Sequence, residues 1–407
     1  MLKFYSICRV IFLTFFPLFV FSMFASMPTG LATTSSSLAF LAAIPLFIKF
    51  LGEYRLSSTE TMGVVLFCTL FASIFWGSSN FTDGLGALSE YRIFLMLPVF
   101  VGALGEVRVG RQFLLGAIIS GAAVSLLISY WMFLGWVPTD GDSMSRGNHI
   151  YHGFIMAVAY FLLLIMARES FGIGRYLYLT FAALVALNVM VVEDGRTGYL
   201  QVIVSTFMFV GLTFNWRKTG FFSAILALIL VALWWSSATL QNKVHNTYIN
   251  LDHAVAQSDT GSSVGLRLEF YRNALDIVSA NPVVGVGVAS VADALERRYR
   301  EGKMRVYTDN VHSEFLNMSM AAGVFGLVFF ASFVFAIAYD GMRAKQLGDT
   351  KLGDCLVGLA SIVLVSAMFN STIKDFGEKN VLMTVLSICL AYLAKLTQRT
   401  DPRFNRQ

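Results

Sequence analysis

The chain has 407 residues, of which 56% are hydrophobic and only 14% are charged. Soluble domains carry about 25% charged residues, so this composition excludes an ordinary soluble globular protein. The formal net charge of +5 could suit a nucleic-acid binder. However, most of the excess is Lys and Arg in short loops, where such residues set membrane topology, so we expect no nucleic-acid partner.

Apolar runs of roughly 18 residues or more recur along the sequence, and a run of that length can cross a bilayer as a helix. Hydrocarbon offers no partner to backbone polar groups, so the spans must be helical, and their continuous apolarity argues against a barrel. The sequence therefore predicts an all-α polytopic membrane protein with about twelve transmembrane helices. The centres of the runs lie at 11–23, 38–50, 62–76, 85–104, 113–137, 151–167, 176–192, 198–214, 221–235, 315–338, 352–369 and 381–396.

The first run follows Lys3 and Arg9 and could be read as a cleavable signal peptide. A second apolar run follows almost at once, after only a short polar link. We therefore expect the first run to be retained as a transmembrane helix.

The connections between the runs alternate in charge. One set is acidic or neutral and lies at 81–83, 139–142 and 193–194. The positive-inside rule places the other, basic set in the cytoplasm, together with both termini, as an even number of spans requires. The basic set consists of Arg55, Arg108, Arg111, Arg168, Arg175, Arg217, Lys218, Arg343, Lys345, Lys351, Arg399, Arg403 and Arg406.

One polar segment is too long for a simple connection, and the topology puts it outside the cytoplasm. We expect three parts: nine transmembrane helices in 1–235, an outer helical loop domain in 236–311, and three more helices with a cytoplasmic tail in 312–407. Within the outer domain an amphipathic helix is predicted at 265–280 and a second one at 290–301. The apolar stripe of the first would consist of Leu266, Phe270, Leu275 and Val278, and Asn281-Pro282 would end it.

The sequence contains no phosphate-binding Walker loop, which argues against transport driven by ATP within this chain. The four cysteines lie in or at the edge of apolar runs, so neither a disulfide framework nor a cysteine metal site is expected.

Three ionisable residues near membrane level on the outer face are candidates for chemistry, because charge is costly there. Arg196 lies in a short turn between two spans, and Arg267 opens the first amphipathic helix. Both suit an anionic ligand, since a guanidinium stays charged and binds phosphate oxygens in a planar fork; pairing with neighbouring carboxylates or lipid headgroups is the structural alternative. His312, where the outer segment re-enters the membrane, suits a general base or an ordinary helix-end hydrogen bond.

Other polar residues on the outer face are weaker candidates. Arg146, His149 and His152 lie around the start of the span at 151–167. The two histidines are three residues apart, which also fits a metal pair, but no third ligand is evident nearby and no metal is expected. The cluster of Arg297, Arg298 and Arg300 is either a solvated patch or a surface that steers a phosphorylated acceptor. The role of Arg92, inside or near the end of a run, is open, and snorkelling is the simplest reading.

Three local motifs surround the large outer segment. The first reads GRTGYL from Gly195; the second reads RLEFYRNAL from Arg267 and leads into NPVVGVG at 281–287; the third reads NVHSEFL from Asn310 and leads into GVFG at 323–326. Their order and placement resemble the O-antigen ligase and polymerase superfamily of bacterial envelope glycan assembly, over roughly residues 190–330. The histidine of that family commonly follows proline and precedes asparagine, whereas Val311 and Ser313 stand there in this chain. The stretch 148–151 also looks like what ligases have before a span.

The resemblance implies a GT-C-like enzyme of the bacterial inner membrane with its active site at the periplasmic face. The donor would be O-antigen on undecaprenyl diphosphate, the acceptor lipid A–core, and the surroundings membrane lipid. Arg196 and Arg267 would stabilise the diphosphate, and His312 would accept the proton of the attacking hydroxyl, with inversion at the anomeric carbon. No cofactor and no metal are expected. The residues expected to bind donor or acceptor are Asn148, His149, Arg146, Arg297, Arg298 and Arg300.

Other functions remain open. A polymerase of the same superfamily would join repeat units on the same lipid carrier, although the modest length and basic outer helix favour a ligase. Pilin-type oligosaccharyltransferases are further relatives, but they tend to be longer and carry an additional outer domain. A secondary transporter or lipid flippase would require charges buried mid-span, broken helices and pseudo-symmetric halves. The single large outer segment argues against such symmetry.

Overall fold

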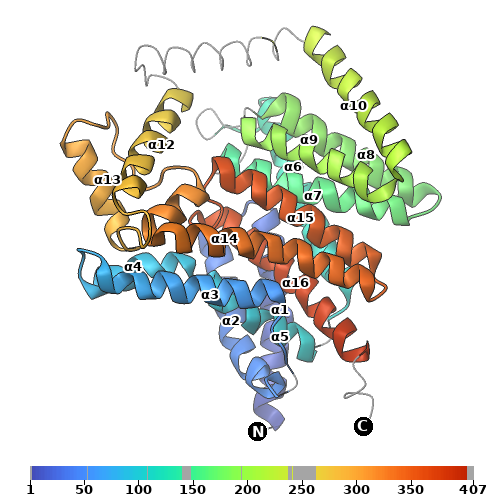
Figure 1. The fold of residues 1–407 in the computed structure, drawn as a ribbon. Coiled ribbons are helices and arrows are strands. Elements are labelled where there is room, and N and C mark those ends of the chain that lie inside the picture. Colours follow the sequence, from blue (N-terminus) through green and yellow to red (C-terminus); the bar gives the residue numbers. More distant parts are fainter. Residues whose placement is uncertain are drawn as a thin grey trace.

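The structure, a computed structural model, describes residues 2–52, 54–107, 109–139, 148–193, 195–236, 241 and 263–400 (Figure 1). Helices account for the regular structure of these residues, and no strand occurs among them, so the predicted all-α class is confirmed. The helices are α1 Leu2–Phe24, α2 Thr29–Phe50, α3 Ser58–Ser73, η1 Ile74–Trp76, α4 Phe81–Leu88, η2 Ser89–Tyr91, α5 Ile93–Val107, α6 Arg111–Phe133, α7 His149–Glu169, α8 Ile173–Leu187, η3 Asn188–Val192, α9 Arg196–Thr213, α10 Trp216–Ser236, α12 Ser263–Ala280, α13 Ser290–Arg300, α14 Glu314–Gln346, α15 Thr350–Phe369 and α16 Phe376–Thr400.

Nine helices in the described part of the chain are long and apolar enough to cross a membrane, or ten if a bent pair is one span. They are α1, α2, α3 with η1, α6, α7, α8 with η3, α14, α15 and α16, and the bent pair joins α4 and η2 to α5. The runs predicted as the eighth and ninth spans form α9 and α10, which are helical but are not among the nine. A polytopic membrane protein is confirmed, and the count of twelve stays a prediction.

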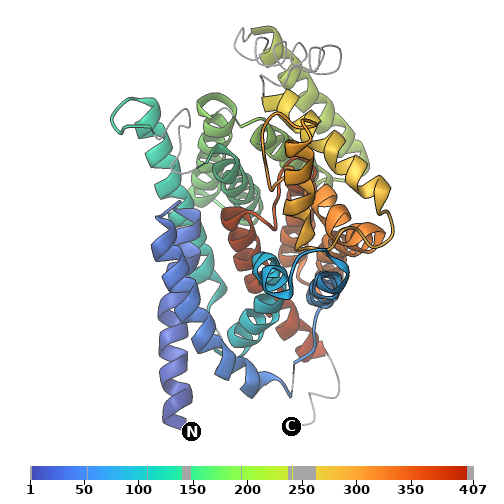
Figure 2. The same ribbon diagram turned by 90° about the vertical axis from the view of Figure 1, so that its left-hand side faces the viewer.

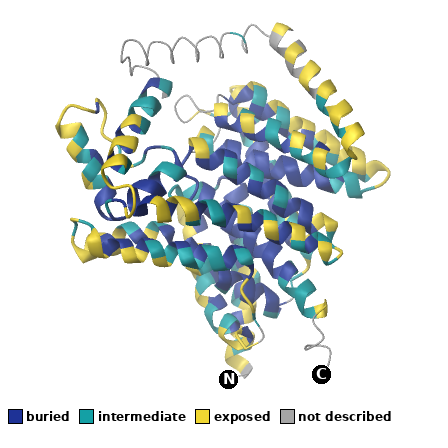
Figure 3. Cartoon of the chain, in the orientation of Figure 1, coloured by how far each residue is buried: buried dark blue, intermediate teal, exposed yellow. Residues whose placement is uncertain are grey.

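The helix α7 lies at the centre of the bundle. Of its most apolar 18 residues, 83% are buried inside the protein, against 33% for α2 and 28% for α8. A helix that is apolar all round but exposed on most sides faces lipid, so α2 and α8 form part of the periphery. Figure 3 shows the same division, with buried residues in the middle and exposed ones along α10. The start of α1 and the end of α16 lie towards the same end of the bundle (Figures 1 and 2).

The fourth predicted span is not continuous. The run at 85–104 breaks at η2, and the helical segments Phe81–Tyr91 and Ile93–Val107 meet at an angle of 45°. Arg92 stands at the break with an exposed side chain, and its guanidinium donates a hydrogen bond to the Ser89 carbonyl at 3.0 Å. An arginine within an unbroken apolar helix would be costly, and the break exposes its side chain.

A second break, in α14, joins the outer helices to the bundle. Gly323 has a φ of 59°, which interrupts the helical hydrogen bonds. The carbonyls of Met320 and Ala321 instead accept hydrogen bonds from the N–H groups of Val286 and Gly287 at 2.8 and 3.1 Å. A Cβ atom on Gly323 would lie 2.3 Å from the Val283 carbonyl oxygen, so only glycine fits there. The second and third sequence motifs therefore interlock through their backbones.

The two helices predicted in the outer segment are present as α12 and α13, which lie beside the first part of α14 (Figures 1 and 2). The predicted apolar stripe of α12 was partly wrong. Leu275 is 55% exposed, and the buried apolar side chains are Phe270, Ala274 and Ile277. Leu275 lies five positions after Phe270, about 140° away around an α-helix, so it cannot share that face. Residues 237–240 and 242–262 of the predicted outer domain lie outside the described residues, and its boundaries stay a prediction.

Candidate active site

The turn that carries Arg196 packs against the start of α7. Arg196 is the first residue of α9, and its side chain is exposed. A Cβ atom on Gly195 would lie 3.3 Å from the carbonyl oxygen of His149, and one on Gly153 would lie 3.2 Å from Cα of Gly198. The glycines thus let α7 and α9 approach closely, as small residues do between membrane helices. They bring the 148–149 stretch beside Arg196.

Arg267 connects the outer helix α12 to this turn. Its side chain is half-buried. Burial lowers the pKa of Arg267 most; the neighbouring Tyr271 raises it, and the positive charge of Arg196 lowers it further. The two guanidiniums therefore interact across the space between α9 and α12. Repulsion between two neighbouring like charges is costly, and a bound anion would relieve it.

His312 is held in a strained backbone conformation. Its φ is 54°, in the left-handed region that residues other than glycine rarely adopt, at a typical cost of about 1–3 kcal/mol. Its N–H donates to Oδ1 of Asn310 at 3.0 Å, and its carbonyl accepts a hydrogen bond from the Tyr271 hydroxyl at 3.0 Å. The buried Glu314 accepts from the N–H of Ile373 at 2.9 Å, which docks the segment on the link between α15 and α16.

The ring of His312 lies in a half-buried, charged environment. Burial lowers its pKa below the ordinary 6.5, the charges of Arg267 and Lys374 lower it further, and Asp309 opposes them. The imidazole is therefore neutral at physiological pH and able to accept a proton. Its Nδ1 is buried and has no hydrogen-bond partner among the described residues. A polar atom left in this way is costly, so other contacts must offset the cost of this ring position.

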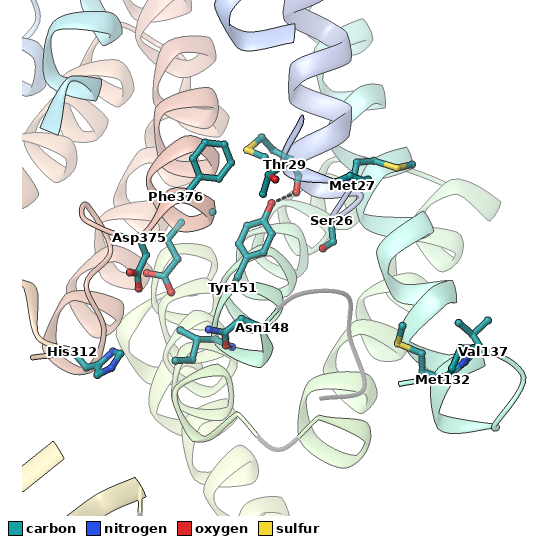
Figure 4. Close-up of a pocket in the computed structure, with 16 residues that line it drawn as sticks. Ser26, Met27, Thr29, Met132, Val137, Asn148, Tyr151, His312, Asp375 and Phe376 are labelled. Carbon is teal, nitrogen blue, oxygen red and sulfur yellow. Dashed lines mark hydrogen bonds between the residues drawn. The ribbon is translucent and has the colours of Figure 1, made fainter. Parts of the chain in front are cut away.

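A pocket of about 720 Å³ opens beside His312 (Figure 4). His312, Asp375 and Asn148 line its polar side, and Tyr151 stands between them and the α1–α2 turn. The Tyr151 hydroxyl donates a hydrogen bond to the Met23 carbonyl. The opposite wall is largely apolar and consists of Met23, Met27, Pro28, Met132, Val137 and Pro138. Arg196 and Arg267 do not line this pocket, so the site has a cationic end and a separate pocket, with His312 beside both.

Comparison with protein families places a match around the three candidate residues. The family model described as O-antigen ligase matches residues 181–331, which contain Arg196, Arg267 and His312. The resemblance to the O-antigen ligase superfamily is confirmed. No curated protein matches the chain in a sequence search. Asn148 and Asp375 lie outside the matched O-antigen ligase region but line the same pocket as its histidine.

Sequence reasoning missed three residues around the O-antigen ligase motifs. Asp375 lines the pocket, and burial raises its pKa to about 6, against the lowering effect of Lys374 and a neighbouring lysine. Lys374 donates to the Asp309 carbonyl at 2.6 Å and pairs with its carboxylate at 3.4 Å. Tyr271 holds the His312 carbonyl. Lys374 and Asp375 lie in a short link between two predicted spans on the outer face. Arg196 was selected as an ionisable residue near membrane level on that face, and the same criterion would have selected Lys374 and Asp375.

The basic cluster on α13 lies in ordinary ion pairs. Arg298 pairs with Asp276 at 3.1 Å, and Arg300 pairs with Glu296 at 2.5 Å. Arg297 is exposed. These pairs favour a solvated face over a dedicated substrate site for Arg298 and Arg300. Arg146 lies outside the described residues.

The two histidines of α7 do not form a metal pair. His152 is fully buried, and its two ring nitrogens face Ser125 Oγ at 3.2 Å and Asn188 Oδ1 at 2.8 Å. His149 lies at the exposed first position of α7, beside the turn that carries Arg196. Within the described ranges, no group of three or more His, Cys, Asp and Glu side chains could hold a metal ion.

Proposed function

We propose that the protein is an O-antigen ligase that transfers polysaccharide from undecaprenyl diphosphate to lipid A–core at the periplasmic face of the bacterial inner membrane. The observation that carries the proposal is the position of Arg267. It lies on α12 one turn before Tyr271, whose hydroxyl donates to the His312 carbonyl at 3.0 Å, and it is close enough to Arg196 to be affected by that charge. Two fixed cations and a neutral imidazole at one place suit the transfer of a sugar from a diphosphate to a hydroxyl.

The reaction breaks the bond between the anomeric carbon and the phosphate oxygen, and negative charge grows on the leaving diphosphate. Arg196 and Arg267 stabilise that charge more in the transition state than in the ground state, which is what accelerates the step. The acceptor hydroxyl attacks the anomeric carbon from the opposite side, so the configuration inverts. His312 takes the hydroxyl proton as the new carbon–oxygen bond forms.

The pocket beside His312 supports the assignment of the acceptor side. Asp375 and Asn148 offer hydrogen-bonding oxygens to sugar hydroxyls, and the apolar wall suits a molecule that carries acyl chains. The two guanidiniums, outside the pocket, can supply the electrostatic stabilisation that a metal gives in other enzymes. We therefore propose metal-independent transfer.

The topology supports a periplasmic site with cytoplasmic termini. Basic residues predicted to be cytoplasmic form ion pairs at the other ends of the helices: Arg111 with Asp349 at 3.2 Å, and Arg168 with the buried Asp354 at 2.7 Å. His312 and Arg267 lie in the long outer segment, and the basic loops alternate with it, as the positive-inside rule requires.

The transporter alternative deserves comparison because the structure contains broken helices and buried charges. However, Glu314 and Glu378 lie in the first turns of α14 and α16, at the level of His312 rather than mid-span. The break in α14 is closed by backbone hydrogen bonds to 282–287. Both features hold the site together, which favours a transferase.

A gene deletion tests the proposal. The null strain should lose O-antigen from lipid A–core and accumulate long glycan on undecaprenyl diphosphate. Attachment of single repeat units to the core would identify the polymerase instead, and a normal lipopolysaccharide ladder would exclude both enzymes and favour a transporter.

A further inference from the structure

The amide side chain of Asn310 lies between the two groups that line the polar side of the pocket. Its Oδ1 accepts hydrogen bonds from the His312 N–H at 3.0 Å and from the Ser371 hydroxyl. Its Nδ2 donates to Oδ1 of Asp375 at 3.2 Å. One side chain therefore contacts the backbone of the proposed base and the carboxylate opposite it.

These contacts fix the chemical type of residue 310. A backbone N–H can only donate, so the atom facing His312 must be an acceptor, and the amide orientation follows from that contact. The atom facing the Asp375 carboxylate must then be a donor. An aspartate would place two carboxylates against each other, and an apolar residue would leave both groups unpaired. Asparagine supplies the acceptor and the donor together.

Asn310 is itself held in place. Its N–H donates to the Thr308 hydroxyl oxygen at 3.0 Å, and its carbonyl accepts from the same hydroxyl at 2.7 Å. The Asn317 side chain also approaches Oδ1 at 3.5 Å and donates to Ser371 at 2.9 Å. A side chain whose backbone and neighbours are fixed can hold its partners rigidly.

We infer that Asn310 is a positioning residue, which keeps His312 in its left-handed conformation and aims the Asp375 carboxylate into the pocket. The expected effect on the rate rests on the proposed function, because only a transfer reaction would require the two groups at a fixed separation. The expected effect on the conformations of His312 and Asp375 does not depend on that function.

The test uses Asn310→Asp and Asn310→Ala in the full-length protein, with Asn380→Ala as the matched control. Asn380 is a buried asparagine on α16 whose side chain donates to the Phe376 carbonyl at 2.8 Å and contacts neither His312 nor Asp375. Transfer of glycan from an undecaprenyl-diphosphate-linked donor to lipid A–core is measured between about pH 6 and 8.5, within the range where His titrates. Thermal stability is measured at each pH.

Asn310→Ala should lower kcat by about 100-fold, the scale expected when reacting groups are misplaced by about 1 Å. Asn310→Asp should be most impaired at high pH, where residue 310 and Asp375 are both ionised. Its activity relative to wild type should rise as pH falls, because a protonated carboxyl donates and accepts as the amide does. If Asn310 has a purely structural role, the variants should be less stable, and the ratio of variant to wild-type activity should not change with pH. That result would overturn the inference.

Several charged groups surround this pair and set the background titration. They act equally on wild type and variant, so the ratio of activities removes most of their effect. They are Lys374, Lys379, Asp309 and Glu90 around Asp375, the buried Glu314 and Glu378 on the helices beside it, and Arg267 near His312.

A structure of Asn310→Ala separates the inference from the proposed function. The backbone of residue 312 should leave the left-handed region, and the Asp375 side chain should move. If both stay in place, the positioning role is wrong whatever the substrate is. If wild type fails to transfer glycan to lipid A–core, the proposed function is wrong, while this structural comparison still decides the role of Asn310.

Discussion

The hydroxyl of Tyr271 donates a hydrogen bond to the backbone carbonyl of His312 at 3.0 Å. Tyr271 lies one helical turn after Arg267 on α12, so the proposed anion-binding residue and the proposed base are tied to one rigid helix. The strained conformation of His312 is therefore fixed from the outer segment by Tyr271 and from its own loop by Asn310.

Replacement of Tyr271 by phenylalanine tests this link. The change removes the hydrogen bond to the His312 carbonyl, worth about 1 kcal/mol, together with a longer contact to the Met368 carbonyl at 3.5 Å. It should reduce kcat/KM about fivefold while the protein still reaches the membrane. The measurement is glycan transfer by purified protein. Tyr299→Phe, at an exposed tyrosine of α13, is the control and should behave as wild type. Equal activity of the two variants would show that the Tyr271 hydroxyl does not position His312.

The proposed anion-binding role of Arg267 is tested by removing its charge. Arg267→Ala should lower kcat by about 100- to 1,000-fold, the usual effect of removing one preorganised donor to a developing anion. Arg267→Lys should restore part of the rate, since a lysine keeps the charge but loses the planar fork. Arg272→Ala, at an exposed arginine on the same helix, is the matched control. A comparable loss in Arg272→Ala would point to the whole helix rather than to the site.

The pH dependence of transfer follows from the environment of His312. A base works only when neutral, and burial together with the Arg267 charge lowers the pKa of His312 below 6.5. Activity should therefore be constant above about pH 7 and fall only below pH 6.5. The Asp375 carboxyl, with a pKa of about 6, would titrate over the same acidic part of the pH–rate profile.

Two neighbours should move this acidic limb in opposite directions. Asp309 raises the pKa of both His312 and Asp375, whereas Lys374 lowers the pKa of both. Asp309→Asn should shift the limb to lower pH, and Lys374→Met should shift it to higher pH. The pH–rate profiles of the two variants provide the measurement. Shifts in the same direction would mean that neither group controls the limb.

The interlock between α14 and the outer segment is tested at Gly323. An alanine there would have to adopt a φ of 59° and would bring its Cβ to 2.3 Å from the Val283 carbonyl oxygen. Gly323→Ala should lower the free energy of unfolding by more than about 2 kcal/mol, measured as thermal stability in detergent. Gly211→Ala is the control, because that glycine of α9 has no heavy atom within 4 Å of its would-be Cβ. If the stability of Gly323→Ala is unchanged, the left-handed conformation of Gly323 is not needed for a stable fold.

The sequence indicated the helices and three candidate site residues, but not the contacts that surround those candidates. Arg196, Arg267 and His312 could be predicted because each lies in a motif at the outer end of a helix. Asp375 could not be placed beside His312 from spacing alone, since 62 residues and two helices separate them. Their proximity depends on how α14, α15 and α16 pack.

The buried histidine of α7 makes the same point. The spacing of His149 and His152 fits a metal pair, although no metal was expected, and His152 faces Ser125 on α6 and Asn188 on η3. Those partners lie 27 and 36 residues away, so no local pattern predicts them. The break at Arg92 was not predicted, since snorkelling of the arginine would have kept the span continuous.

The most direct measurement of the central claim is transfer by the purified protein in lipid, with an undecaprenyl-diphosphate-linked glycan as donor and lipid A–core as acceptor. The account predicts that wild type and Arg272→Ala form glycan-bearing lipid A–core, and that Arg196→Ala, Arg267→Ala and His312→Ala do not, although all are folded. Transfer that persists in His312→Ala and Arg267→Ala, or no transfer by wild type, would contradict it.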